Sequence, residues 1–200
     1  MRKSAKEAAQ TRARIVATAA EKFREGGIVA TGLNGLMGAA GLTHGGFYKH
    51  FASKDQLVAE ACAHVAAAVT SALVEQARMA PAGERLAAFV RAYLSRSHRD
   101  HPGTGCGFAA LASEMGRMGP EVKAVGTEAF QNIADALAEL APRLQGSDAD
   151  ARARVAAATM VGALICARAV GDEALSHAIL MDARESVIRQ LQAPGSPAGP

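Results

Sequence analysis

Two hundred residues can form one large core, or a small domain joined to a larger one. Half of the residues are hydrophobic, alanine supplies much of that fraction, and tryptophan is absent. No run of β-branched residues alternates with period two. Closely packed helices are therefore expected, and a sheet protein is excluded. The net charge of +3 is uneven, because residues 1–55 carry +5 and the remainder carries −2.

The first fifty residues predict three helices, of which the second and third form a helix-turn-helix. Helical periodicity runs from about residue 6 to residue 25, and Gly26-Gly27 ends it. A second helix is expected over residues 33–40, and Gly41 makes the turn that follows. The third helix, over residues 44–50, has Thr43 as its N-cap candidate.

The second helix is expected to be weak. Gly35 and Gly38 both lie inside it, and each costs about 1 kcal/mol relative to alanine. The helix-turn-helix unit should therefore be only marginally stable without the helices that pack against it.

The rest of the chain predicts a larger helical domain. A fourth helix starts at residue 53 or 54 and runs to about residue 77. Proline and glycine separate the further helices, which are expected over residues 84–99, 106–117, 121–140, 148–170 and 172–192. The predicted fold is thus all-α, with a helix-turn-helix domain over 1–53, a larger domain over 54–192 and a Pro/Gly/Ser-rich disordered tail over 193–200.

The third helix has two chemically different faces. Phe47 and Phe51 lie four residues apart and can face inward together. The remaining positions are rich in hydrogen-bond donors and cations, as a DNA-reading helix would be. Gly45-Gly46 would let the backbone approach a duplex closely, although these glycines could also merely continue the turn.

The motif Gly-Leu-Thr-x-Gly-x-Phe-Tyr-x-His-Phe-x-Ser-Lys-Asp-x-Leu, at residues 41–57, resembles the helix-turn-helix signature of the TetR family of bacterial transcriptional repressors. The run Arg14-Ile15-x3-Ala19-x3-Phe23-x2-Gly26 resembles the first helix of that family. The resemblance implies a repressor that binds a palindromic operator as a dimer. It also implies a larger domain that binds a small-molecule inducer, which releases the DNA.

The resemblance also implies which residues contact DNA. Residues 43–45 would open the recognition helix toward base edges, and the cationic and aromatic residues that follow would contact the groove and the phosphates. Thr31 and Lys54 stand at predicted helix starts, where free amides and the helix dipole favour phosphate. The predicted DNA-binding residues are Thr31, Thr43, His44, Gly45, Tyr48, Lys49, His50 and Lys54. Individually, Tyr48 could be a packed aromatic residue and Lys49 a solvated charge.

The last two helices are the predicted homodimer interface. The uncharged stretch 155–167 is apolar nearly all round, and Ala158, Gly162 and Cys166 repeat at intervals of four as a small-residue stripe. The alternative is packing within one subunit. On the last helix, the apolar residues expected to complete a four-helix interface are Ile179, Leu180, Val187, Ile188 and Leu191.

The inducer site is predicted only as a set of candidate walls. Each member could equally be a plain core residue. Glu114, within an apolar stretch, is expected to be solvated, with an inward position as the alternative. The predicted ligand-binding residues are Phe89, Tyr93, Cys106, Phe108, Leu111, Met115, Phe130 and Met160.

Cys106 carries two further alternatives. It begins a predicted helix near His98, Arg99 and His101, a setting that could lower the pKa of a thiol. Cys106 could therefore sense electrophiles or oxidants and so control DNA release. A cysteine-dependent enzyme is the other alternative, although no nucleophile-elbow pattern is present.

The remaining sequence features indicate a cytoplasmic protein without a membrane span, a metal or a cofactor. The three cysteines form no C-x-x-C pair, and His98, His101 and Cys106 match no standard zinc spacing. The basic N-terminal end resembles that of a signal peptide, but charges interrupt the apolar segment 15–20 at once. The thirteen uncharged residues 155–167 are fewer than the roughly twenty of a spanning helix.

Overall fold

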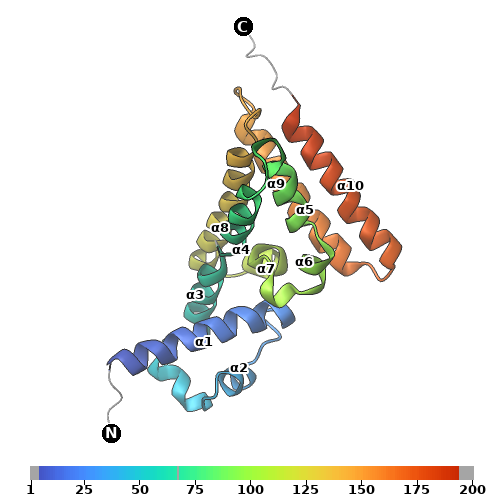
Figure 1. The fold of residues 1–200 in the computed structure, drawn as a ribbon. Helices are drawn as coiled ribbons and strands as arrows, with labels where there is room; N and C mark the ends of the chain where they lie inside the picture. The colour runs from blue at the N-terminus through green and yellow to red at the C-terminus, as the bar shows by residue number, and fades with distance from the viewer. Residues whose placement is uncertain (1–4, 67, 194–200) are drawn as a thin grey trace. The chain divides into compact units, whose positions relative to one another are not determined.

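The computed structural model describes residues 5–66 and 68–193, and all regular secondary structure in these ranges is helical (Figure 1). The all-α prediction is therefore confirmed. The helices form two compact units. The first contains the described residues up to 66 together with 102–127, and the second contains 68–101 together with 128–193. Most of the predicted tail, residues 194–200, lies outside the described residues.

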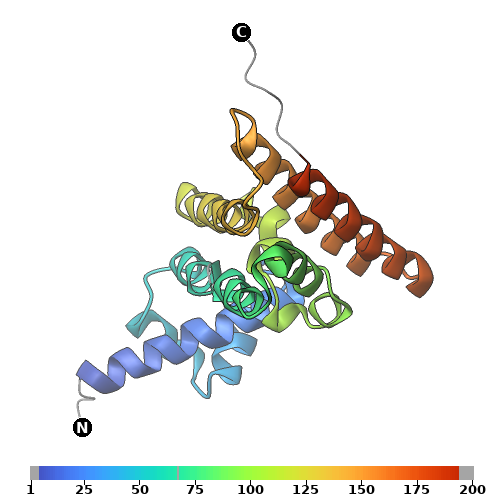
Figure 2. The ribbon, with the colours of Figure 1, turned by 45° about the horizontal axis from the view of Figure 1, so that its top comes forward.

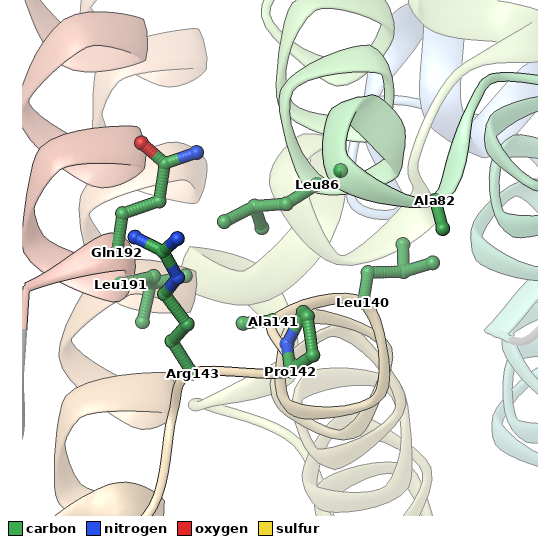
Figure 3. A pocket seen from close by; sticks show the side chains of 9 residues that line it. Ala82, Leu86, Leu140, Ala141, Pro142, Arg143, Leu191 and Gln192 are labelled. Carbon is green, nitrogen blue, oxygen red and sulfur yellow. The ribbon is translucent and has the colours of Figure 1, made fainter.

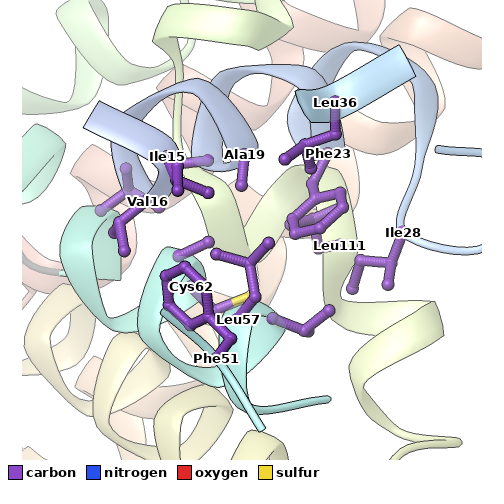
Figure 4. Packing of buried hydrophobic residues seen from close by; sticks show 14 of the residues in the cluster. Ile15, Val16, Ala19, Phe23, Ile28, Leu36, Phe51, Leu57, Cys62 and Leu111 are labelled. Atoms are coloured by element: carbon purple, nitrogen blue, oxygen red, sulfur yellow. The ribbon is translucent and has the colours of Figure 1, made fainter. Parts of the chain in front are cut away.

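The first unit is built around the N-terminal helices and a segment from the middle of the chain. Its elements are α1 (Ala5–Gly26), α2 (Leu33–Ala39), the 3-10 helix η1 (His44–Lys49), α3 (Lys54–Ala66), η3 (Pro102–Thr104), α7 (Gly107–Met115) and the start of α8 (Pro120–Leu140). One face of α1 is buried through Ile15, Ala19 and Phe23, each fully inaccessible. Figure 4 shows these side chains packed with Leu57 and with Leu111 of α7 in one apolar cluster.

A glycine makes the turn of the helix-turn-helix. Gly41 has φ 71°, a left-handed conformation that glycine adopts without strain. Its N–H donates to the carbonyl of Gly38 (2.9 Å), and the N–H of Leu42 donates to that of Met37 (2.8 Å). These two bonds form a Schellman motif that satisfies the last carbonyls of α2.

The recognition segment, η1 (His44–Lys49), is a 3-10 helix rather than the predicted α-helix. Its i to i+3 bonds include Gly46 N–H to the carbonyl of Thr43 (3.0 Å) and His50 N–H to that of Phe47 (2.9 Å). Two consecutive glycines near the start lower α-helical propensity, and 3-10 geometry is common in such short pieces.

The second unit contains the last two helices, which lie side by side (Figure 2). Its elements are α4 (Ala68–Arg78), η2 (Ala82–Glu84), α5 (Arg85–Tyr93), α6 (Arg96–Asp100), the rest of α8, α9 (Ala149–Ala169) and α10 (Glu173–Gln192). Asp172 caps α10, because its Oδ1 accepts from the N–H groups of Ala174 (2.8 Å) and Leu175 (3.0 Å).

The single helix predicted over residues 84–99 is wrong. The chain leaves helical geometry at Leu94 (φ −90°, ψ 38°), and α6 begins two residues later. Ser95 starts it as an N-cap, with its Oγ accepting from the N–H of His98 at 3.1 Å. A serine cap of this kind is a recognised start signal, so the break was readable in the sequence.

A buried arginine joins α6 to α10. The guanidinium of Arg99, 9% exposed, donates to Asp100 Oδ1 (2.6 Å), Ser176 Oγ (2.7 Å) and Glu173 Oε1 (3.0 Å). The hydrogen bonds that Arg99 donates to Asp100 and to Glu173 raise its pKa, the bond to Asp100 more than the bond to Glu173. Arg168 of α9 donates to the carbonyl of Arg99 (3.1 Å), so three helices are connected at this point.

By length and composition alone, residues 54–78, of which the structure describes all but residue 67, are apolar enough to cross a membrane, and the core helix of a soluble protein passes the same test.

His98 should make stability depend on pH. Burial lowers its pKa to about 4, a nearby Arg168 lowers it further, and its hydrogen bond to the carbonyl of Tyr93 (2.6 Å) opposes them. An unfolded histidine binds a proton near pH 6.5, so as pH falls from about 6.5 to 4 the unfolded state gains protons that the folded state does not. The free energy of unfolding should decrease over this window, by about 3 kcal/mol.

The measurement is denaturant unfolding between pH 7 and pH 4. The substitution His98→Gln should flatten the slope, whereas His64→Gln, at an exposed position, should leave it unchanged. Equal slopes for the parent protein and His98→Gln would contradict the assignment.

Candidate nucleic-acid interface

Two stacked aromatic rings anchor the recognition segment. Phe47 and Phe51 are 0% and 2% exposed, and their ring centroids lie 5.5 Å apart at 22°. The inward orientation predicted from their spacing is confirmed. Because both rings face the core, η1 must turn its other residues outward.

The outward residues are those that the sequence predicted to contact DNA. Thr43, His44, Gly45, Tyr48 and Lys49 are exposed, and His50 is half-buried. Tyr48 is 65% exposed although its ring meets that of Phe47 edge-on, with centroids 5.1 Å apart. Thr43 has the extended backbone of an N-cap but makes no side-chain cap bond. Hydroxyl groups and a lysine are thus presented together on one short segment.

His44 and Gly45 differ in their contacts with the rest of the chain. The Nδ1 atom of His44 is hydrogen-bonded to Oδ1 of Asn34 on α2, which fixes the imidazole against the preceding helix. A Cβ added at Gly45 would meet nothing within 4 Å. Packing among the residues that the structure describes therefore gives no reason for a glycine at position 45.

Two arginines of α1, Arg12 and Arg24, make their contacts inside the first unit. Arg12 lies over the ring of Phe51, 4.6 Å from its centroid, and its Nη2 donates to Glu60 Oε1 at 2.5 Å. Arg24 donates from Nε to the carbonyl of Gly103 at 2.8 Å, and burial lowers its pKa. These arginines hold α1 to α3 and to η3.

The loop between α1 and α2 is held by opposite charges. Glu114 of α7 accepts at Oε1 from the N–H of Ile28 (3.1 Å) and at Oε2 from the N–H of Val29 (2.8 Å). Lys54 of α3 donates from Nζ to the carbonyls of Ile28 (2.8 Å) and Thr31 (2.8 Å). The two polar groups of Ile28 are therefore bound by a carboxylate and an ammonium, and its side chain is 2% exposed.

These contacts bear on three sequence predictions. Glu114 is not solvated but half-buried and doubly hydrogen-bonded, so the alternative inward position is the observed one. Lys54 uses two of its three N–H donors inside the unit, and its phosphate contact stays a prediction that the third donor could serve. Thr31 donates to the carbonyl of Gly27 (2.6 Å), while Gly32 occupies the N-cap position of α2.

The eight predicted ligand-binding residues are divided between the units. Leu111 and Met115 belong to the apolar cluster of the first unit, with Phe108 packed against it, and Cys106 in the same unit is 5% exposed. In the second unit, the rings of Phe89 and Tyr93 lie 6.3 Å apart on α5. Met160 is fully buried on α9, and Phe130 is half-buried on α8.

Two hollows in the second unit contain none of these eight residues. One, of about 190 Å³, lies where η2, α5, α8 and α10 meet (Figure 3). The other, of about 290 Å³, lies between α4 and α8. The ligand-wall residues chosen from sequence stay a prediction.

Comparisons with known proteins agree with this arrangement. The family model described as bacterial regulatory proteins, tetR family, matches residues 15–61, and that described as tetracyclin repressor-like, C-terminal domain, matches residues 81–191. The second model covers more than half of the chain. This chain belongs to the TetR family. Among curated protein sequences, none matches significantly.

Solved structures share the fold of this chain. A regulator from Cytophaga hutchinsonii is 21% identical, with a TM-score of 0.77, over 94% of this chain and 98% of that one. A regulator from Streptomyces coelicolor is 25% identical, with a TM-score of 0.71, over 92% and 97%. The reduced form of NemR from E. coli is 20% identical, with a TM-score of 0.75, over 94% and 100%.

The family match confirms the N-terminal helix-turn-helix domain and the larger C-terminal helical domain. This TetR-family protein is a DNA-binding transcriptional regulator. Sequence reasoning missed the part that Glu114 plays. Glu114 lies in the segment matched by the C-terminal family model, but its carboxylate binds the loop that precedes α2 in the N-terminal one.

Glu114 should control the order of this loop. Replacing it with alanine removes the acceptor for two backbone N–H groups, and hydrogen bonds to charged groups contribute about 1.5–3 kcal/mol each when buried, less here because Val29 is exposed. We expect faster amide hydrogen exchange at Ile28 and Val29, and DNA affinity about tenfold lower.

Glu114→Gln, which keeps one acceptor, should give an intermediate effect. Glu121→Gln, at an exposed position of the same unit, is the matched control. Unchanged exchange at both amides in Glu114→Ala would show that the carboxylate does not order the loop.

Proposed function

We propose that this regulator is a repressor, that it binds a palindromic operator as a homodimer, and that a small-molecule inducer releases it. The observation that carries the DNA-reading part is the exposed polar face of η1, which the buried pair Phe47 and Phe51 turns outward. One such short helix contacts only a few base pairs, so specificity needs two copies. The protein would act in the cytoplasm, where DNA is present and free thiols stay reduced.

The outer face of α9 and α10 supports dimerisation. Ala158 and Cys166 of the predicted small-residue stripe are exposed, and a Cβ at Gly162 would meet nothing within 4 Å. Large apolar side chains are exposed on the same two helices, which is the pattern of an uncovered interface. They are Val155 (55%), Ile165 (41%), Leu175 (51%) and Met181 (36%).

The predicted composition of this interface needs a correction. Leu180, Val187 and Leu191 are each 0% exposed within a single chain, so they pack α10 against its own unit. They cannot supply the contact with a second copy, and the exposed residues of the two helices take that place in the proposal.

Ile165→Glu is expected to dissociate the dimer, because it places a charge in an apolar contact at a position that is 41% exposed in the single chain. Sedimentation velocity should show a monomer. The helix content of the variant should be unchanged, and its binding to the operator should be lost. Ala138→Glu, at an exposed position of α8, should remain dimeric. If the Ile165→Glu protein is still a dimer, the dimer interface does not include this position of α9.

Selection of duplex DNA from a random pool is expected to return an inverted repeat, with half-sites about 34–36 Å apart or a multiple of that distance. On this operator Gly45→Ala should weaken binding about tenfold, because the added methyl faces the duplex, while unfolding free energy stays equal or rises by up to about 1 kcal/mol.

The matched control is Gly119→Ala, at another exposed glycine with open space around its Cβ. Its DNA affinity should equal that of the parent protein. Failure to enrich any duplex would overturn the repressor proposal, whereas equal affinity of Gly45→Ala would remove only the role given to this glycine.

Release by a thiol switch at Cys106 is the weaker alternative. Cys106 is 5% exposed at the residue before α7, and a buried thiol is poorly accessible to an electrophile. Burial also raises the pKa of Cys62, in the same unit, to about 11, so that thiol stays protonated near neutral pH. These observations favour an inducer that binds without covalent chemistry. The cysteine-dependent enzyme gains no support from families of regulators.

A further inference from the structure

The hollow at the end of the second unit has an apolar interior and a polar rim on one side. Leu86, Leu140 and Leu191, which are at most 4% exposed, line it together with Ala141. Figure 3 shows the guanidinium of Arg143 and the amide of Gln192 near each other on one side, facing Leu86 and Leu140. The complete lining is Ala82, Gly83, Leu86, Leu140, Ala141, Pro142, Arg143, Leu191 and Gln192.

The two polar groups at the rim are available to a ligand. Within the part of the chain that the structure describes, neither the Arg143 side chain nor that of Gln192 makes a hydrogen bond or ion pair. None of the nine lining residues is acidic. A planar guanidinium beside an amide N–H matches the two oxygens of a carboxylate, and the apolar interior favours a hydrocarbon chain.

We propose that this pocket binds a small aliphatic monocarboxylate, with its chain against the leucines and its carboxylate on Arg143 and Gln192. The volume of about 190 Å³ is more than ten times the roughly 10–15 Å³ that one water molecule needs on the same measure. The hollow is therefore large enough for a short aliphatic chain. This binding role is separate from DNA reading and does not depend on the repressor proposal.

The second hollow, between α4 and α8, has an acidic lining. Glu75, Asp135 and Glu139 line it, and its one cation, Arg78, pairs with Glu75 and Glu139 at 2.5 Å each. Its remaining charge repels a carboxylate. Selectivity for an anion therefore belongs to the Arg143 pocket, although both hollows lie in the same unit.

The probe is sodium hexanoate, titrated calorimetrically into the full chain, with 1-hexanol as the uncharged match and hexylamine as the cationic one. We expect saturable binding of hexanoate at one site per chain. The alcohol should bind about tenfold more weakly, and the amine should not bind at this site, because a charge-assisted hydrogen bond contributes about a factor of ten or more.

Two variants locate the site. Arg143→Ala should lower hexanoate affinity about tenfold, and Ala82→Phe, at an exposed rim position, should block hexanoate and hexanol alike. Arg189→Ala, at an exposed position of α10, is the charge-matched control and should bind as the parent does. No saturable binding to the parent, or equal binding to Arg143→Ala or Ala82→Phe, would overturn the proposal.

Discussion

The α1–α2 loop depends on a carboxylate and an ammonium that hold one residue from two directions. Glu114 accepts from the N–H of Ile28 and Lys54 donates to its carbonyl. The apolar side chain of Ile28 joins the core at the same time. Because this loop leads into α2, its order decides where the helix-turn-helix starts. A residue of the segment that the C-terminal family model matches thereby holds the loop that leads into the helix-turn-helix.

This arrangement explains how a weak helix pair is kept folded. Gly35 and Gly38 in α2 have open space around them, and the recognition segment is a short 3-10 helix. Neither element gains much from intrinsic propensity. Stability comes instead from the stacked pair Phe47 and Phe51, the Schellman bonds at Gly41 and the charged contacts of the preceding loop. Local weakness is compensated by tertiary contacts.

How much was predictable follows from the range of each interaction. The helix-turn-helix and its inward aromatic residues follow from fixed local spacings. The contact of Glu114 with residues 28 and 29 spans 86 and 85 positions and leaves no periodic signal. The same holds for the ion pair of Arg12 with Glu60, which joins residues 48 positions apart. The break at Ser95 did have a local signal, because a serine cap was present.

Gly27 illustrates a consequence for mutational tolerance. Its φ is 85°, and a Cβ would lie 2.8 Å from Oε1 of Glu114, so any other residue would strain the backbone and displace the carboxylate together. In a screen for alleles that lose control of transcription, substitutions of Gly27 would resemble substitutions in the recognition segment η1, although Gly27 lies outside that segment. The phenotype of such a substitution would indicate the recognition segment, whereas the substituted residue lies directly after the end of α1. The displaced carboxylate of Glu114 would connect the two.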